Sequence, residues 1–240
     1  MLRSVRDRQD FLGGHRMFSR RQKMDLLSFL LQQEILRFGS FVTKSGRVSP
    51  YFFNFGHLSS GASLYKLGGF IAEALERTDW LGTSDALFGP AYKGISLVQA
   101  TAMHLWREKQ IDVAYCFNRK ERKGHGEGGQ FIGKELTPSA KVVLVDDVLT
   151  GGTSLRESAA LLQSHGVEIV GMLVVIDRCE RGSGNKRASV EMSEALQVPL
   201  LSLLDFDEIL DLAFDKPIAG RVWIDSECMA KIVSYRQQHS

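Results

Sequence analysis

The sequence predicts an α/β fold, in which a mostly parallel sheet is flanked by helices on both faces. Two observations carry this prediction. Strands made wholly of apolar residues recur from about residue 86 onward, and single helices separate them; such strands are typical of a parallel sheet that is buried on both sides. The chain has 240 residues, 44% of them hydrophobic, which is enough for one large core.

The N-terminal part predicts a helix followed by a β-hairpin. From Gln22, apolar residues recur at helical spacing, at Leu26, Leu27, Leu30, Leu31 and Ile35. Gly39 is expected to end this helix. Two β-rich runs joined at Ser45-Gly46, in FVTKSGRVSPYFFNF, then predict a hairpin. We expect residues 1–21 to be a disordered extension and 22–240 to form a single domain.

Strands and helices alternate after the hairpin. We expect strands over 86–88, 113–117, 142–145, 169–176 and 200–204, and helices over 64–76, 95–106, 154–164 and 207–214. One interval, NRKERKGHGEGGQFIGKELTPSA, contains no convincing helix and is basic and glycine-rich. A long loop of this kind in a compact domain is usually functional or disordered.

Composition excludes several classes of protein. The net charge is +2, from 30 basic and 28 acidic side chains, so we expect neither a nucleic-acid partner nor a membrane surface. The three cysteines, Cys116, Cys179 and Cys228, are widely spaced and form no C-x-x-C motif. This favours a reducing compartment, the cytoplasm. The sequence contains no run of about 18 apolar residues, so we expect no membrane-spanning helix. The Arg-rich N-terminus contains Asp7 and Asp10 and lacks an apolar stretch, so we expect no secretory signal.

The stretch VVLVDDVLTGGTS, residues 142–154, carries the strongest functional signal. Asp146 and Asp147 would emerge at the carboxyl end of a parallel strand, where ligands bind in open α/β sheets. The residues that follow lead into a helix, so their backbone N–H groups and hydroxyls would lie at the positive end of the helix dipole. These residues are Thr150, Gly151, Gly152, Thr153 and Ser154. This pattern predicts an anion-binding turn.

Two carboxylates beside such a turn would repel a phosphate, so they must bind another part of the same ligand. Ionised carboxylates accept hydrogen bonds, and a vicinal diol donates two. The turn is therefore interpreted as a ribose 5-phosphate site. Direct metal binding by the two acids, or helix capping without a ligand, stays open as an alternative. No G-x-x-x-x-G-K-[ST] is present, which argues against a P-loop; the G-x-G-x-x-G match at Gly124, Gly126 and Gly129 does not follow a strand.

The same stretch resembles the phosphoribosyl-pyrophosphate signature of the type I phosphoribosyltransferases. The motifs KSGRVSPYFFNFG, LFGPAYKGIS, YCFNRKERKGHGEGG and DRCERGSG resemble those of the family members that act on orotate, in the family's order from about Lys23 to about Leu212. Gly151 departs from the family's usual alanine or threonine, and Asn185-Lys186 from its usual acidic residues. The resemblance implies a Mg²⁺-dependent transfer of ribose 5-phosphate to orotate, and a small helix–hairpin hood over about 22–60.

The resemblance also implies roles for individual residues. Asp146 and Asp147 would bind the ribose hydroxyls, and the 5-phosphate would contact Thr150, Gly151, Gly152, Thr153 and Ser154. Val148 and Leu149 would also contact phosphoribosyl pyrophosphate. Orotate would be held by Phe52, Phe53, Thr150 and Arg178. The pyrophosphate would be approached by Lys44, Tyr92, Lys93, Arg119, Lys120, Lys123 and His125. Lys123 is expected to have the largest effect on the rate. Mg²⁺ would bind mainly through the substrate, with no direct protein ligand.

The resemblance further implies a homodimer in which the basic loop, 119–129, reaches the partner subunit's site. Two other functions are weighed against this one. A phosphoribosyltransferase for a purine base should lack Phe52-Phe53 and the basic loop. A regulator that senses phosphoribosyl pyrophosphate without catalysis should carry a nucleic-acid-binding extension, for which the residues before the first helix are too few.

Overall fold

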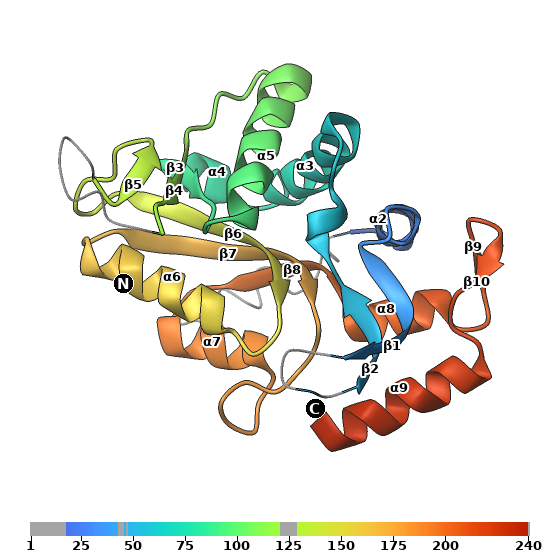
Figure 1. The fold of residues 1–240 in the computed structure, drawn as a ribbon. Helices are drawn as coiled ribbons and strands as arrows, with labels where there is room; N and C mark the ends of the chain where they lie inside the picture. The colour runs from blue at the N-terminus through green and yellow to red at the C-terminus, as the bar shows by residue number, and fades with distance from the viewer. Residues whose placement is uncertain (1–17, 43–45, 47, 121–128, 240) are drawn as a thin grey trace.

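A six-stranded sheet forms the centre of the protein, in the order β5-β4-β3-β6-β7-β8 (Figure 1). This computed structural model describes residues 18–42, 46, 48–120 and 129–239. Strands β4, β3, β6, β7 and β8 run parallel, and β5 pairs antiparallel with β4. The predicted α/β class with a mostly parallel sheet is confirmed.

The strands lie where buried apolar runs predict them. They are β3 Ala86–Phe88, β4 Tyr115–Asn118, β5 Phe131–Gly133, β6 Lys141–Leu149, β7 Glu168–Asp177 and β8 Leu200–Asp205. In β6, Val142 and Leu144 pack into one core cluster while Val143 and Val145 pack into the other, because successive side chains point to opposite faces. Both faces of the sheet are therefore buried.

Two features of these strands differ from the prediction. Strand β6 continues to Leu149, four residues beyond its predicted end, because its pairing with β7 runs on to Leu149 and Asp177. Asp146 and Asp147 consequently lie within the strand rather than in the loop that follows it. Strand β5 was not predicted, since three residues at a sheet edge carry no readable alternation.

Helices cover both faces of the sheet (Figure 1). On one face lie α3 Gly61–Leu75, the single-turn α4 Trp80–Thr83 and α5 Lys93–Lys109; on the other lie α6 Thr153–Ser164 and α7 Ala188–Leu196. Helix α8 Phe206–Ala213 follows β8 directly. Helix α7 was not predicted, because its buried residues are Ala188, Met192 and Ser193, which give only a weak apolar stripe.

The N-terminal helix packs onto the main core, and the hairpin after it forms a sheet of its own. Helix α2 Arg20–Gln32 begins at a capping box formed by Ser19 and Gln22, and Phe18 before it is fully buried. Strands β1 Leu36–Val42 and β2 Val48–Phe53 form a separate antiparallel sheet, as predicted, and the 3-10 turn η1 Phe55–His57 follows. The predicted helix stop at Gly39 is wrong, because this glycine lies inside β1. The expected extension, except for its last four residues, lies outside the described residues.

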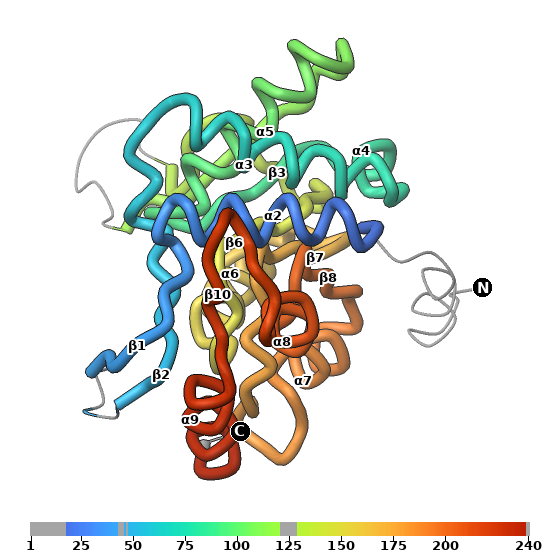
Figure 2. The backbone as a smooth tube through the Cα atoms, turned by 90° about the vertical axis from the view of Figure 1, so that its right-hand side faces the viewer, coloured from blue at the N-terminus to red at the C-terminus, as the bar shows by residue number. Residues whose placement is uncertain are grey.

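The C-terminal residues form a small hairpin, β9 Pro217–Ile218 and β10 Arg221–Val222, and then helix α9 Ser226–His239. Helix α9 packs against β2 (Figure 2). Its buried residues include Ile232 and Tyr235, too few to predict the packing from the sequence.

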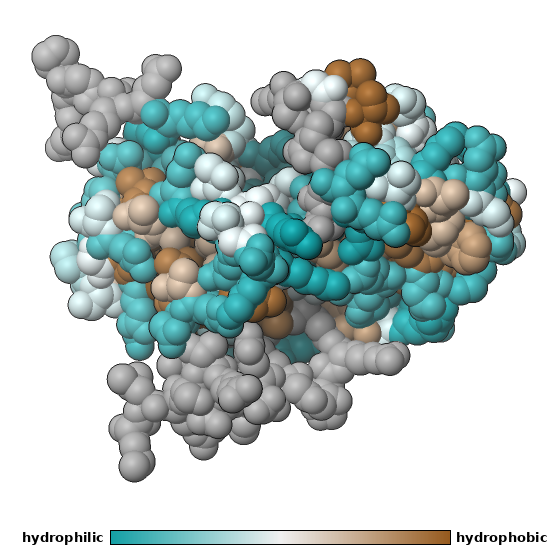
Figure 3. Space-filling model, turned by 90° about the horizontal axis from the view of Figure 1, so that it is seen from below, coloured by the Kyte–Doolittle hydropathy of each residue, from teal (hydrophilic) through white to brown (hydrophobic). Residues whose placement is uncertain are grey.

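The outer surface is largely hydrophilic. In the view from below, hydrophobic residues form separate patches among hydrophilic ones (Figure 3). Across the described ranges, no helix combines the length and apolar character that crossing a membrane requires.

Candidate active site

Several of the predicted site residues lie at the carboxyl ends of three neighbouring strands. Strand β6 lies between β3 and β7, and the N–H of Arg178 donates to the carbonyl of Leu149 at 3.1 Å. The end of β6 and the start of the loop after β7 are thereby joined. The acid pair, the turn after it and Arg178 all lie at one edge of the sheet, where α/β folds bind ligands.

The acid pair is buried and hydrogen-bonded. Asp146 and Asp147 are only 6% and 7% exposed. The Asp146 carboxylate accepts the N–H of Asp147 at 2.9 Å and the hydroxyl of Ser154 at 3.2 Å. The Asp147 carboxylate accepts the ammonium of Lys93 at 2.7 Å. Lys93, which begins α5, thus contacts an acid expected to bind ribose.

The two carboxylates differ in charge balance. Lys93 offsets the charge of Asp147, whereas the partners of Asp146 are two neutral donors. Burial raises the pKa of Asp146 to about 7, and the neighbouring charge of Asp147 adds to the rise, while both hydrogen bonds oppose it. A ligand that donates hydrogen bonds or brings positive charge would favour the ionised form of Asp146.

The turn after β6 depends on Gly152. Its φ is +80° at the N-cap of α6, a conformation that costs little for glycine and more for any residue with a Cβ. A Cβ here would also lie 3.2 Å from Cγ of Met192. Arg156, which sequence reasoning missed, donates from Nη2 to the carbonyl of Gly151 and so fixes the turn from the first turns of α6. Its spacing four residues after Gly152 was the available signal.

The two glycines of the turn give a matched prediction. We expect Gly152→Ala to destabilise the fold by about 1–2 kcal/mol, because alanine meets both the positive φ and the Met192 side chain. Gly151→Ala should change the stability by less than about 0.5 kcal/mol, since a Cβ there meets nothing within 4 Å. Urea unfolding measures both values. Equal losses from the two variants would contradict the role given to Gly152.

A second turn lies beside the acid pair, between β3 and α5. The N–H of Ala91 donates to Oδ1 of Asn118 at 2.9 Å, so the end of β4 holds this turn. Tyr92 is 70% exposed, and the ammonium of Lys120 lies 4.6 Å from the centre of its ring, a cation–π distance. The structure therefore brings together Tyr92, Lys93 and Lys120. Asn118 was missed by sequence reasoning.

Part of the basic loop is described. The N–H of Arg119 donates to the carbonyl of Gln130 at 2.9 Å and closes the base of the loop. Three residues of the predicted site, Lys44, Lys123 and His125, lie outside the described residues. Their assignment to pyrophosphate stays a prediction.

The two phenylalanines predicted to cover orotate lie on opposite faces of β2. Phe53 faces the core, where the guanidinium carbon of Arg178 is 5.9 Å from the centre of its ring. Phe52 stacks on Phe41 at 5.5 Å on the other face, because strand side chains alternate. Tyr51 shares the face of Phe53, and its ring centre lies 5.2 Å from the same guanidinium carbon. Tyr51 was not predicted as a site residue, although its place two residues before Phe53 in a strand puts both side chains on one face.

Two other groups of polar residues lie outside this sheet edge. The ligand atoms of Cys179, Asp205 and Asp207 lie within 4.8 Å of one another, a spacing that a metal ion could use. However, the guanidinium of Arg187 lies 3.4 Å from Sγ of Cys179 and donates to Asp207 at 2.6 Å. This arginine already supplies the positive charge, so the cluster is explained without a metal.

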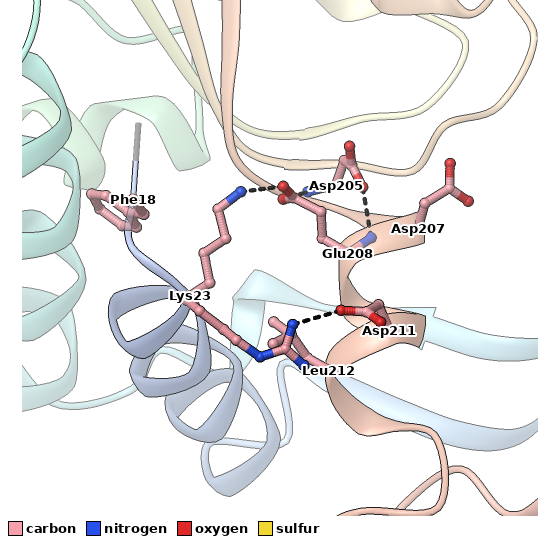
Figure 4. Close-up of a pocket in the computed structure, with 8 residues that line it drawn as sticks. Phe18, Lys23, Asp205, Asp207, Glu208, Asp211 and Leu212 are labelled. Carbon is pink, nitrogen blue, oxygen red and sulfur yellow. Dashed lines mark hydrogen bonds and ion pairs between the residues drawn. The ribbon is translucent and has the colours of Figure 1, made fainter. Parts of the chain in front are cut away.

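A cleft of about 300 Å³ separates the start of α2 from α8 (Figure 4). Lys23 pairs with Glu208 across it, and Arg20 pairs with Asp211 at 2.8 Å. The acidic groups of the cleft therefore have partners within the chain. These ion pairs hold α2 against α8, so the candidate active site is the sheet edge and not this cleft.

Comparisons with known proteins identify the family of this chain. A family model described as the phosphoribosyl transferase domain matches residues 58–202. An orotate phosphoribosyltransferase of Hamiltonella defensa is 46% identical over 191 residues, covering 80% of this chain and 86% of that protein. The enzyme of that name from Shewanella oneidensis is 40% identical over 215 residues, covering 90% and 95%. The crystal structure of the Francisella tularensis orotate phosphoribosyltransferase matches with a TM-score of 0.75 and 36% identity, covering 89% and 98%.

A mostly parallel sheet flanked by helices, together with these matches, defines a phosphoribosyltransferase. Within that class the chain belongs to the orotate phosphoribosyltransferase family, whose members are pentosyltransferases of pyrimidine biosynthesis. The resemblance found in the sequence is confirmed.

Proposed function

We propose that orotate and 5-phosphoribosyl pyrophosphate react at the edge formed by β3, β6 and β7, giving orotidine 5'-monophosphate and pyrophosphate on the route to UMP. The observation that carries this proposal is the buried pair Asp146 and Asp147 directly before the positive-φ turn at Gly152. A ligand with a diol next to a phosphate matches both features at once.

The roles of the residues follow from their chemistry. The ribose hydroxyls donate to Asp146 and Asp147, and the 5-phosphate accepts from the N–H groups and hydroxyls of residues 150–154. Loss of pyrophosphate leaves positive charge at the anomeric carbon of the ribose, and carboxylates held in a buried site stabilise that charge. Orotate attacks through its ring nitrogen as an anion, so no general base is assigned. Positioning and charge stabilisation account for the catalysis.

The side chains around the acid pair fit a magnesium complex of the sugar substrate. Both partners of Asp146 are neutral donors, so its carboxylate can face a cation, and oxygen is the ligand that Mg²⁺ prefers. Mg²⁺ bound through oxygens of the substrate would supply positive charge to the leaving pyrophosphate. Lys93 holds Asp147 until the substrate binds and then turns to the pyrophosphate.

The basic loop supplies the remaining positive charge. Arg119, Lys120, Lys123 and His125 approach the pyrophosphate, with Lys44 and Tyr92 on the same side. In the proposed homodimer each loop serves the site of the partner subunit. Orotate lies at the hairpin on the Phe53 side of β2, with Thr150 and Arg178 at its edge, while Phe52 on the opposite face stacks on Phe41 and does not share this contact. The free thiols of Cys116, Cys179 and Cys228 support a cytoplasmic location.

A two-substrate assay tests the proposed reaction. The ultraviolet absorbance of orotate should fall only when 5-phosphoribosyl pyrophosphate and Mg²⁺ are both present. Consumption of a purine base in place of orotate would favour a purine phosphoribosyltransferase. Binding of the sugar substrate without consumption of any base would favour a sensing regulator.

Hybrid dimers test the shared site. We expect equimolar mixing of two inactive variants, Lys123→Ala and Asp146→Asn, to restore about a quarter of the wild-type activity, because random pairing makes half the dimers hybrid and each hybrid has one intact site. Each variant mixed with itself is the control. If the loop served its own subunit, every site in the hybrid would carry one defect and no activity would return.

A further inference from the structure

Glu180 is a buried acid beside the orotate site that the reaction described above does not use. Its carboxylate lies 2.5 Å from Nη2 of Arg178, and the two side chains are 12% and 14% exposed. We propose that Glu180 is a positioning residue, which fixes the guanidinium of Arg178 in the orientation that binds orotate. This inference rests on the proposed role of Arg178.

Two aromatic rings lie against the Arg178 guanidinium. Its carbon lies 5.2 Å from the ring centre of Tyr51 and 5.9 Å from that of Phe53. The backbone of the arginine is held by its hydrogen bond to Leu149. These contacts do not determine the direction in which the N–H donors of the guanidinium point, which depends on its rotation. A charged partner on one side sets that rotation, and Glu180 is placed to do so.

Glu180 engages one end of the guanidinium and leaves donors available. Arginine has five N–H donors, and the contact with Glu180 involves Nη2. Within the described part of the chain, the buried Nε of Arg178 has no hydrogen-bond partner. A carboxylate ligand can therefore bind Arg178 while Glu180 stays in place. The geometry favours positioning over competition, in which Glu180 would occupy the donors that orotate needs.

The cluster also contains a buried hydroxyl without a hydrogen-bond partner. Among the described residues nothing pairs with the hydroxyl of Tyr51. A buried polar atom without a partner is costly, and a ligand with donors and acceptors on one edge would relieve that cost. Burial raises the pKa of Tyr51 to about 12, so its hydroxyl keeps its proton.

Steady-state kinetics with Glu180→Gln tests the proposal. The glutamine keeps the shape and loses the charge, so we expect the KM for orotate to rise about tenfold, the scale of one charge-assisted hydrogen bond. The KM for 5-phosphoribosyl pyrophosphate and kcat should change less than about twofold. Glu180→Asp, which keeps the charge on a shorter chain, should restore part of the orotate affinity. The matched control is Glu194→Gln in α7, which removes an exposed ion pair between Glu194 and Lys186.

Each outcome of this experiment has a distinct meaning. An unchanged or lower KM for orotate in Glu180→Gln would overturn the positioning role, and the lower value would mean competition. Equal rises in both KM values with a lowered Tm would make Glu180 a general structural residue and would also overturn it. If the wild-type protein itself does not consume orotate, the proposed function fails and the role of Glu180 fails with it.

Discussion

Replacing Asp146 with asparagine should lower kcat/KM for 5-phosphoribosyl pyrophosphate about 100-fold and yet make the folded protein more stable at pH 8. The loss of activity has a direct cause. Asparagine offers one acceptor oxygen where the carboxylate offers two, and it cannot balance positive charge at the ribosyl centre. Charge-assisted hydrogen bonds are worth about twice as much as neutral ones, so one lost acceptor and one lost charge together give this scale.

The gain in stability follows from the pKa of Asp146. Burial and the charge of Asp147 raise this pKa from 3.8 to about 7 in the folded state. Between these two pH values the folded state binds more protons than the unfolded state, so the free energy of unfolding falls as the pH rises, and the cost is complete above pH 7. Asparagine carries no such cost. We expect a gain of about 1–3 kcal/mol at pH 8 and almost none at pH 4.

Urea unfolding at several pH values measures this difference, and initial rates measure the activity. Asp112→Asn is the control, because Asp112 is an exposed aspartate outside the site and its loss should change neither quantity. A variant that loses stability equally at pH 4 and pH 8 would contradict the charge repulsion. A variant with wild-type kcat/KM would remove Asp146 from the binding of ribose.

Replacing Lys123 with alanine should lower kcat about 100-fold or more, while the KM for orotate changes less than about threefold. The reason is the charge that develops on the leaving pyrophosphate. A pair of unit charges at about 4 Å is worth roughly 4 kcal/mol at an effective dielectric constant of 20, and an interaction formed mainly in the transition state appears in kcat. Single-turnover rates with both substrates saturating measure the effect.

The control for Lys123 is Lys134→Ala, which removes the same charge from an exposed position just after β5. It should leave kcat within about twofold of the wild type. If both variants behave alike, the loss reflects overall charge rather than a specific contact. An unchanged rate for Lys123→Ala would take the basic loop out of the chemistry.

The sheet and the position of the acid pair could be predicted because local sequence determines them. Val142 to Val145 are buried whichever neighbour they meet, and the acids follow this apolar run toward the carboxyl end of the strand, although β6 itself continues past them to Leu149. The roles of Phe52 and Phe53 could not be separated in the same way, because their facing depends on the core beneath β2. Lys93 could be placed in the site, but its bond to Asp147 depends on how α5 approaches β6.

Residues that act through another side chain were harder to find. Glu180 and Arg156 contact Arg178 and the Gly151 carbonyl only after β7 and α6 have packed. No residue pattern marks Glu180 in advance, and Arg156 is marked only by its spacing from Gly152. Helix α7 escaped prediction for a related reason, since small and polar residues fill its buried side.

Helix α9 lies beyond the residues matched by the family model, yet it packs against β2 behind the proposed orotate site. Tyr235 packs edge-on against Tyr51, their ring centres 5.8 Å apart, and Tyr51 underlies the guanidinium of Arg178. Arg236 ties the same helix to Asp207 at the start of α8. The tail thus backs the side chains that we propose to hold orotate. If that proposal holds, trimming the tail would loosen selection of the base, while the strands proposed to bind the sugar would keep their own support.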